Sequence, residues 1–164
     1  MEILSIIPAR GGSTEIPCKN IVQLNKKPLL YYTVNASLNS IVTRTIVSTD
    51  DEEIKDVAQK LGVETIHRPK NISGNKISIE PSISHVLSKL KNNEGYIPDL
   101  IVLLQNTSPL RTMHHIDEAI KLLKHGKFDS VFSGYTSHHL LWEKNGRENR
   151  SVNYNPLSRP NRQQ

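Results

Sequence analysis

The fold is decided by the stretch Ile3-Leu4-Ser5-Ile6-Ile7-Pro8-Ala9-Arg10-Gly11-Gly12-Ser13, an apolar run that leads directly into a glycine turn. The apolar part shows no clean alternation, which is typical of a strand covered on both faces of a parallel sheet. The two glycines allow a tight turn with free backbone N–H groups. The stretch therefore predicts a buried strand whose end can approach a ligand closely.

Strand-like and helix-like segments alternate along the chain. Apolar runs predict strands at Ile3–Ile7, Thr45–Thr49, Val63–Ile66, Asp99–Leu104 and Ser130–Ser133. Between them, apolar residues recur with helical spacing in the segments 54–61, 83–90 and 116–123. This alternation predicts a doubly wound α/β fold with a mostly parallel, Rossmann-like sheet. Ligands bind at the carboxyl ends of the strands in such sheets, so the loops there are the places to look for a site.

Residues that begin and end helices agree with this pattern. Asp50 resembles a helix N-cap, and Pro81 suits the first turn of a helix. Thr112 can cap a later helix that ends near Lys124, with Gly126 as its stop. After Ser133 the helical and strand patterns fade, and we expect a hairpin or an extended arm over residues 134–164.

Length and charge narrow the class of protein. The 164 residues suit a single domain, 1–164. The formal charge of +5 is unevenly spread, because Glu143–Gln164 holds five basic residues and two acidic ones. A cationic tail on a near-neutral body is not a continuous nucleic-acid stripe, so we expect no nucleic-acid partner. A small anionic ligand or a loose terminus suits this distribution better.

Membrane, secretory and disulfide classes are also disfavoured. The longest apolar stretch, Leu100–Leu104, is far shorter than the ~20 residues that span a bilayer. No charged segment followed by an apolar one comes after Met1, so we expect no secretory signal and no membrane partner. Cys18 is the only cysteine and cannot form an internal disulfide. We expect a cytoplasmic protein.

The glycine turn carries the most specific chemistry. Arg10, Gly11, Gly12 and Lys19 combine free backbone N–H groups with two cations, a set that can wrap a polyphosphate. The three-glycine dinucleotide fingerprint and the GxxxxGK[ST] phosphate loop both fail here. A surface turn with two solvated cations stays open as the alternative from composition alone.

At this point a family resemblance becomes specific. The chain resembles the acylneuraminate cytidylyltransferases, which activate sialic, legionaminic and pseudaminic acids as CMP derivatives. Four blocks match in the same order: Ile7–Ser13 with Ile16-Pro17 and Lys19-Asn20, then Val47–Ile54, Arg68-Pro69 and Leu103–Arg111. The resemblance runs from about Glu2 to the end of the chain and implies a nucleotidyltransferase domain.

The resemblance implies a reaction and a set of site residues. The anomeric hydroxyl of a nonulosonic acid would attack the α-phosphorus of CTP and release pyrophosphate, with Mg²⁺ as cofactor. Arg10, Lys19 and Gln105 would be the catalytic residues, and Arg162 would bind the sugar-acid carboxylate beside Gln105. The nucleotide would be bound by Pro8, Ala9, Arg10, Gly11, Gly12, Ser13, Lys19, Asn20 and Arg68, with Asn20 reading cytosine. We also expect a homodimer.

Four departures from the family pattern stand out. Thr14 replaces a lysine of the glycine turn, and Asn106 replaces a proline. The segment 71–77 contains no carboxylate where the family has an acidic stretch. The sequence ends before the family's later strands, whose aspartates bind the metal, so the metal ligands are unknown. We therefore expect a domain that is incomplete at its C-terminus, with an unpaired sheet edge.

These departures leave other hypotheses open. One is a catalytically inactive nucleotide-binding module, from a truncated or decayed copy of such an enzyme. Another is a nucleotidyltransferase for an eight-carbon sugar acid or a sugar phosphate. Arg111 could brace its loop or touch a ligand, and Asp50–Asp51 could cap a helix or bind a metal, capping being the simpler explanation.

Histidine and cysteine chemistry receives little support. The pairs His114–His115 and His138–His139 are adjacent in sequence, so they do not chelate a metal as an i, i+4 pair on a helix does. Lys19 could lower the pKa of its neighbour Cys18. Nothing else in the sequence supports Cys18 as a nucleophile.

Overall fold

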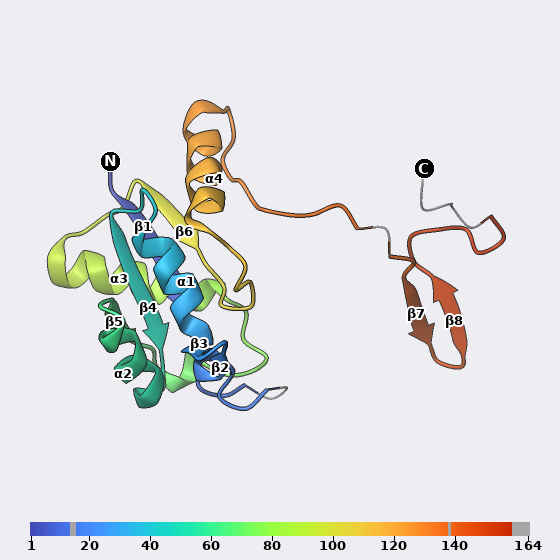
Figure 1. The fold of residues 1–164 in the computed structure, drawn as a ribbon, viewed down its shortest axis with the longest axis horizontal. Coiled ribbons are helices and arrows are strands. Elements are labelled where there is room, and N and C mark those ends of the chain that lie inside the picture. The colour runs from blue at the N-terminus through green and yellow to red at the C-terminus, as the bar shows by residue number, and fades with distance from the viewer. Residues whose placement is uncertain (14–15, 138, 159–164) are drawn as a thin grey trace. The chain divides into compact units, whose positions relative to one another are not determined.

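The structure, a computed structural model, describes residues 1–13, 16–137 and 139–158. The chain divides into two compact units, Met1–Val131 and Phe132–Gln164. The first unit contains a parallel sheet with its helices, and the second contains a small hairpin (Figure 1).

Four parallel strands form the sheet of the first unit, in the order β5-β4-β1-β6. The strands are β1 (Ile3–Pro8), β4 (Arg44–Thr49), β5 (Glu64–His67) and β6 (Leu100–Leu103). The helices are α1 (Leu29–Leu38), α2 (Glu52–Lys60), α3 (Glu80–Glu94) and α4 (Met113–His125). Short elements complete the unit: η1 (Lys19–Ile21), β2 (Gln23–Leu24), β3 (Lys27–Pro28) and η2 (Lys70–Ile72). The predicted doubly wound α/β fold is confirmed.

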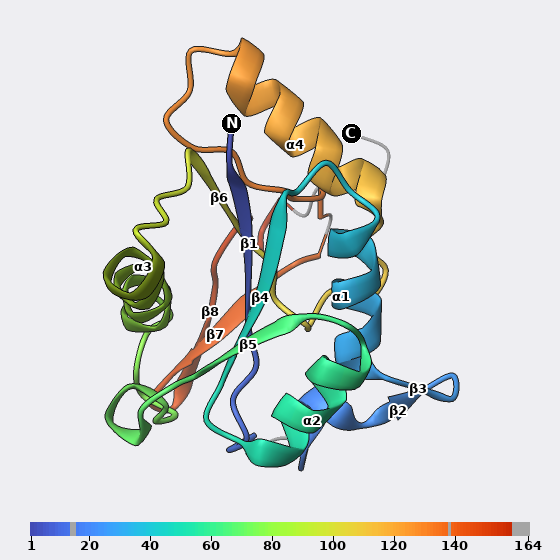
Figure 2. The same cartoon turned by 90° about the vertical axis from the view of Figure 1, so that its left-hand side faces the viewer.

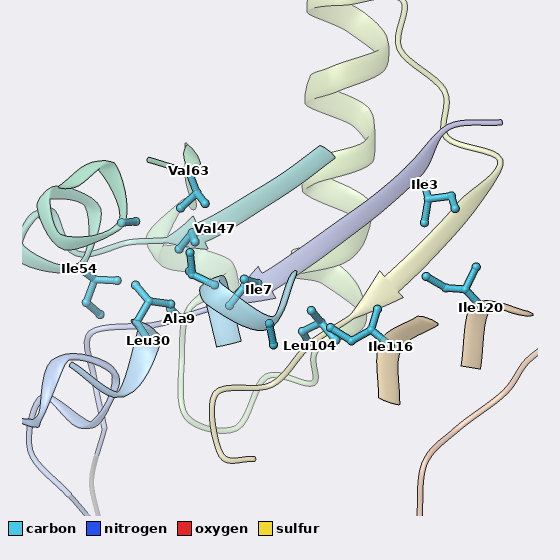
Figure 3. Close-up of a cluster of buried hydrophobic side chains, with 13 residues drawn as sticks. Ile3, Ile7, Ala9, Leu30, Val47, Ile54, Val63, Leu104, Ile116 and Ile120 are labelled. Atoms are coloured by element: carbon cyan, nitrogen blue, oxygen red, sulfur yellow. The ribbon is translucent and has the colours of Figure 1, made fainter. Parts of the chain in front are cut away.

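Helices cover both faces of the sheet, as Figure 2 shows, with α3 on one face and α1, α2 and α4 on the other. Side chains of β1 alternate between the two faces because successive residues of a strand point in opposite directions. Ile3 and Ile7 pack with α1, α2 and α4 in the cluster of Figure 3. Leu4 and Ile6 pack with Val86 of α3 on the opposite face. Both faces of β1 are thus buried, which explains the unbroken apolar run in its sequence.

The path of the chain creates a crevice beside β1. The chain builds β4 and then β5 on one side of β1, and it then returns through α3 to place β6 on the other side. In open α/β sheets, such a reversal of strand order leaves a crevice at the carboxyl ends of the two strands that flank it. The loops that follow β1 and β6 therefore meet at one place.

Helix ends match the sequence signals with one correction. Thr112 forms a capping box at the start of α4, and Pro81 lies in the first turn of α3, as predicted. The cap of α2 is Asp51 and not Asp50, because the Asp51 side chain accepts a hydrogen bond from the Ile54 N–H. Asp50 is therefore left for another role.

Strand β6 forms an edge of the described sheet. Its residues Ile101 and Leu103 are 44% and 36% exposed, whereas Ile6 on the neighbouring strand β1 is fully buried. The predicted strand at Ser130–Ser133 is wrong, since the structure assigns no strand there. This segment spans the boundary between the two units, and Phe132 is 91% exposed and joins no sheet.

The second unit contains an antiparallel hairpin of β7 (Trp142–Asn145) and β8 (Glu148–Ser151). Gly146, with a φ of 63°, occupies the turn, where a positive φ favours glycine. Trp142 packs edge-on against Tyr154, with ring centroids 5.9 Å apart. Among the described residues, no helix is long and apolar enough to cross a membrane.

Candidate functional site

A cleft of about 230 Å³ lies at the carboxyl ends of β1 and β6, where the order of the strands reverses. Its walls come from the glycine turn, the segment between β5 and α3, and the loop that follows β6. Most of the predicted site residues line it, namely Pro8, Arg10, Ser13, Lys19, Asn20, Arg68 and Gln105. The fold therefore brings together predicted site residues that are up to 97 positions apart in the sequence, from Pro8 to Gln105.

Two neighbouring aspartates, Asp50 and Asp51, lie against the glycine turn. The backbone N–H of Gly11 donates to Asp50 Oδ1 at 3.1 Å. A Cβ atom on Gly11 would lie 2.4 Å from Asp51 Oδ2 and 2.9 Å from Asp51 Cβ, which leaves no room for a side chain. Glycine at this position is therefore required by close packing against the start of α2, and the turn is fixed relative to β4.

Two partly buried cations of the turn line the cleft. Arg10 donates from Nη1 to Asn75 Oδ1 at 2.6 Å, so the segment that precedes α3 orients its guanidinium. Lys19 is the first residue of η1 and follows Cys18, whose backbone is left-handed with a φ of 50°. Both cations line the cleft, and their binding of an anion there stays a prediction.

Arg68 supplies a third cation, and this one is buried. Arg68 is 4% exposed, and its Nη1 donates to Ser82 Oγ of α3 at 2.8 Å. Asp50 Oδ1 lies 3.6 Å from Nη2, close enough for an ion pair but too far for a hydrogen bond. Among the described residues, Nε and Nη2 have no hydrogen-bond partner. Burial lowers the pKa of Arg68, and the charge of Asp50 opposes this shift.

Asn20 and Asn106 both line the cleft and connect two of the loops that form it. Asn20 donates from Nδ2 to the backbone carbonyl of Arg10 at 2.8 Å. Asn106 donates from its own Nδ2 to Asn20 Oδ1 at 2.9 Å. Both residues are buried, with exposures of 6% and 3%. This pair of bonds joins the loop after β6 to the glycine turn.

Gln105 lines the cleft, and Arg111 braces its backbone. Arg111 donates from Nη2 to the Gln105 carbonyl oxygen at 3.1 Å. The sequence left open whether Arg111 braces its loop or touches a ligand, and the geometry shows the bracing contact. Burial lowers the pKa of Arg111.

Some predicted site residues do not line the cleft. The Ala9 side chain is buried in the core, and Gly11 and Gly12 contribute backbone at the turn and do not line the cleft wall. Thr14, His138 and Arg162 lie outside the described residues. Sequence reasoning missed Asn75 and Ser82 as cleft residues and gave Asp50 another task. These residue types carry no motif signal, and only the fold brings them next to Arg10 and Arg68.

The described residues do not fit a protein-held metal ion. They contain no group of three or more His, Cys, Asp or Glu side chains that could bind one. The two aspartates nearest the glycine turn are engaged elsewhere, Asp50 with Gly11 and Arg68 and Asp51 with the start of α2. The capping interpretation of this pair therefore applies to Asp51.

The strand order β5-β4-β1-β6 and a glycine turn flanked by cations are typical of nucleotide-binding α/β domains. Within that class, a family profile described as cytidylyltransferase matches residues 4–164, and the chain belongs to this family.

Relatives and solved structures agree with this assignment. The chain is 40% identical over 122 residues to an N-acylneuraminate cytidylyltransferase of Escherichia coli, covering 74% of this chain and 28% of the relative. It is 36% identical over 163 residues to N-acylneuraminate cytidylyltransferase B of Danio rerio, covering 97% of this chain and 37% of the relative. The chain thus spans about a third of the length of these relatives.

A solved structure with the same fold is a CMP:2-keto-3-deoxy-manno-octonic acid synthetase complexed with CTP. Its TM-score is 0.64 at 21% sequence identity, and the match covers 76% of this chain and 48% of that one. At this identity the likeness shows the fold alone.

Proposed function

We propose that the protein transfers CMP from CTP to the anomeric hydroxyl of a sialic-acid-like nonulosonic acid and releases pyrophosphate. The observation that carries the proposal is the convergence of Arg10, Lys19 and Arg68 on one cleft with Gln105. Three cations beside a glycine turn suit a triphosphate, and the loop after β6 adds neutral polar groups for a second substrate. The names of the two relatives support N-acylneuraminate as the acceptor class.

In the proposed reaction, the anomeric oxygen forms a bond to the α-phosphorus. The bond from that phosphorus to the bridging oxygen breaks, pyrophosphate leaves with the electron pair, and the hydroxyl proton passes to solvent. Such a displacement needs in-line positioning and stabilisation of negative charge rather than a covalent nucleophile. Arg10 and Lys19, both partly buried, supply charge for the leaving phosphates. The buried Arg68 supplies a charge held in place by Ser82 and Asp50.

Mg²⁺ belongs to the proposal as an ion that accompanies the reaction, but no step is assigned to it, because the described residues offer no cluster to hold it. Chelation with EDTA tests the requirement. Loss of turnover on chelation, with recovery on adding Mg²⁺, is the expected result, and undiminished turnover in EDTA would remove Mg²⁺ from the proposal.

Pyrophosphate release is the direct test of the proposed reaction. The purified chain is incubated with CTP, Mg²⁺ and, in turn, N-acetylneuraminate, legionaminate, pseudaminate and 2-keto-3-deoxy-manno-octonate. Turnover with a nine-carbon acid supports the proposal, whereas turnover with the eight-carbon acid alone would favour the related sugar-acid hypothesis. Binding of CTP without turnover would make this chain a nucleotide-binding module, an alternative that the family match does not favour.

A charge-matched pair of variants links the activity to the cleft. Arg10→Ala removes a cation that lines the cleft, and Arg150→Ala removes an exposed cation of the hairpin unit. We expect Arg10→Ala to weaken CTP binding by roughly tenfold or more, since a charge-assisted contact contributes about 1.5–3 kcal/mol. Arg150→Ala should leave CTP binding unchanged, and equal losses in the two variants would contradict the assignment of the cleft.

We also propose a homodimer and a cytoplasmic location. Support for association comes from the exposed aromatic residues of the second unit, because Phe132, Tyr135 and Trp142 are 91%, 84% and 52% exposed. Light scattering across a concentration series tests the dimer, and a monomer mass at the highest concentration would contradict it.

The cytoplasmic location follows from the proposed use of CTP, and fractionation of the source cells tests it.

A further inference from the structure

We propose that Asn106 is a specificity-determining residue of the cleft: it orients Asn20 and offers its own Oδ1 to a hydrogen-bond donor on the nucleoside part of the ligand. The proposal rests on the proposed use of CTP and extends it to a residue that the family resemblance does not place in the site. The family pattern has proline at this position, and proline has no side-chain acceptor.

The backbone carbonyl of Arg10 fixes which way the side-chain amides of Asn20 and Asn106 point. The carbonyl oxygen of Arg10 can only accept, so the group of Asn20 that faces it at 2.8 Å must be the NH₂ group. The Oδ1 of Asn20 therefore faces the opposite way, towards Asn106. An oxygen at that place requires a donor, so the group of Asn106 that lies 2.9 Å away must also be NH₂.

One acceptor is left over at the end of this chain of hydrogen bonds. With its NH₂ group committed to Asn20, Asn106 must point its Oδ1 elsewhere, and no described residue donates to that atom. Asn106 is 3% exposed and lines the cleft. A buried acceptor without a donor costs free energy, and a ligand that supplies the donor recovers it.

The position of Asn106 favours a nucleoside donor over a phosphate. The phosphates of CTP carry acceptors and no donor when ionised, so they cannot satisfy Oδ1. The nucleoside carries donors of two kinds, the 4-amino group of cytosine and the hydroxyls of ribose. Asn106 also contacts Asn20 directly, and Asn20 is the residue that the family resemblance assigns to the base.

The test compares three nucleotides by calorimetry in the presence of Mg²⁺. CTP carries both kinds of donor, UTP lacks the 4-amino group, and 2′,3′-dideoxy-CTP lacks the ribose hydroxyls. Each is bound to the unsubstituted chain, to Asn106→Leu and to the control Asn92→Leu, which removes an exposed amide on α3. Circular dichroism checks folding, and Asn106→Pro carries the same comparison if Asn106→Leu does not fold.

We expect Asn106→Leu to weaken CTP binding about tenfold, equivalent to roughly 1.4 kcal/mol, while Asn92→Leu changes nothing. The loss should largely disappear for the one analogue that lacks the donor, which identifies base or ribose as its source. An equal loss for all three nucleotides would mean that the lost bond to Asn20, a water molecule or another structural effect accounts for it. That result would overturn the proposal that Oδ1 meets a nucleoside donor. No loss for CTP would overturn it too.

The outcome separates this inference from the function beneath it. If the unsubstituted chain binds CTP and the losses are equal, only the role of Asn106 fails. If the unsubstituted chain binds no CTP, the proposed function fails and the role of Asn106 fails with it.

Discussion

Asp50 and Gly11 are joined by a hydrogen bond in which the backbone N–H of the glycine turn donates to Asp50 Oδ1 at 3.1 Å. The same oxygen lies 3.6 Å from Nη2 of the buried Arg68. One carboxylate at the end of β4 thus holds the turn that follows β1 and balances the charge on the loop that follows β5. Three neighbouring strand ends are tied together through one atom.

Removal of this carboxylate should destabilise the fold through Arg68. In Asp50→Ala, the buried guanidinium of Arg68 loses its counter-charge. Breaking such a pair typically costs about 3–5 kcal/mol of folding free energy, and we expect about 3 kcal/mol here because Ser82 keeps its bond to Arg68. Asp50→Asn keeps an acceptor for Gly11 and should cost less. Urea denaturation measures both, with Asp56→Asn on the exposed face of α2 as the control. Equal stability of Asp50→Ala and the unsubstituted chain would contradict the role given to this pair.

Gly11 and Gly12, adjacent residues of the glycine turn, should differ in how well they tolerate a side chain. Gly11→Ala would place a Cβ atom 2.4 Å from Asp51 Oδ2 and 2.9 Å from Asp51 Cβ, so the turn must move. The nearest described atom to a Cβ on Gly12 is Asn75 Oδ1 at 3.8 Å, an ordinary contact. We expect Gly11→Ala to cost roughly 1–3 kcal/mol of stability, as overpacking does, and to weaken CTP binding. Gly12→Ala should change stability little, and similar losses of stability in the two variants would refute the packing explanation.

The sheet and the turn were predictable from sequence because their signals are local. An unbroken apolar run indicates a strand buried on both faces, and Ile3, Leu4, Ile6 and Ile7 all proved to be buried. The glycine turn with Arg10 and Lys19 likewise carries its chemistry in adjacent residues. Local patterns failed at Ser130–Ser133, where an apolar run has no neighbouring strand to pair with.

The rest of the cleft depends on contacts between distant segments. Arg10 meets Asn75 across 65 positions, and Asn106 meets Asn20 across 86. No periodicity or motif spacing encodes such a contact, since it arises only when the sheet places the two loops together. Asp50 was interpreted as a cap for the same reason, because its partner Gly11 lies 39 positions away.

Arg111 should act on turnover through the backbone of Gln105. Arg111→Ala removes the donor to the Gln105 carbonyl and frees the loop after β6. Because small misplacements of positioning groups cost up to about 100-fold in rate, we expect kcat to fall roughly tenfold while CTP affinity changes little. Lys121→Ala on the exposed face of α4 is the matched control.

A double variant separates positioning from a general loss of stability. If Arg111 acts through Gln105, Arg111→Ala should have little further effect on kcat once Gln105→Ala is present, because coupled residues are not additive. Additive losses would show that Arg111 acts independently of Gln105.

Core substitutions on adjacent strands should differ sharply. Ile6 is fully buried on β1, whereas Ile101 is 44% exposed on the edge strand β6. Ile6→Ala removes buried methyl and methylene groups and leaves a cavity, which typically costs about 2–5 kcal/mol. Ile101→Ala should cost less than about 1 kcal/mol, because a half-exposed side chain loses little burial. Chemical denaturation of the full chain measures the difference, and equal losses would mean that β6 is covered in solution.

The contacts of Arg44 with two carboxylates, those of Glu64 and Glu94, predict that the stability of the protein depends on pH. Its guanidinium donates to Glu94 Oε2 and to Glu64 Oε2, each at 2.8 Å, and the hydrogen bond from Arg44 lowers the pKa of Glu94. A carboxyl whose pKa is lowered on folding stabilises the protein above its unfolded pKa, and this contribution is lost as the pH falls through the folded value. Glu94→Gln should therefore lower the melting temperature slightly at neutral pH, and the difference from the unsubstituted chain should vanish as the pH falls below the lowered pKa of Glu94. The effect should also shrink in high salt, because the Glu94 side chain is 47% exposed. Glu118→Gln on the exposed face of α4 serves as the control, and a Glu94→Gln difference that persists undiminished in acid would exclude the ion pair as its cause.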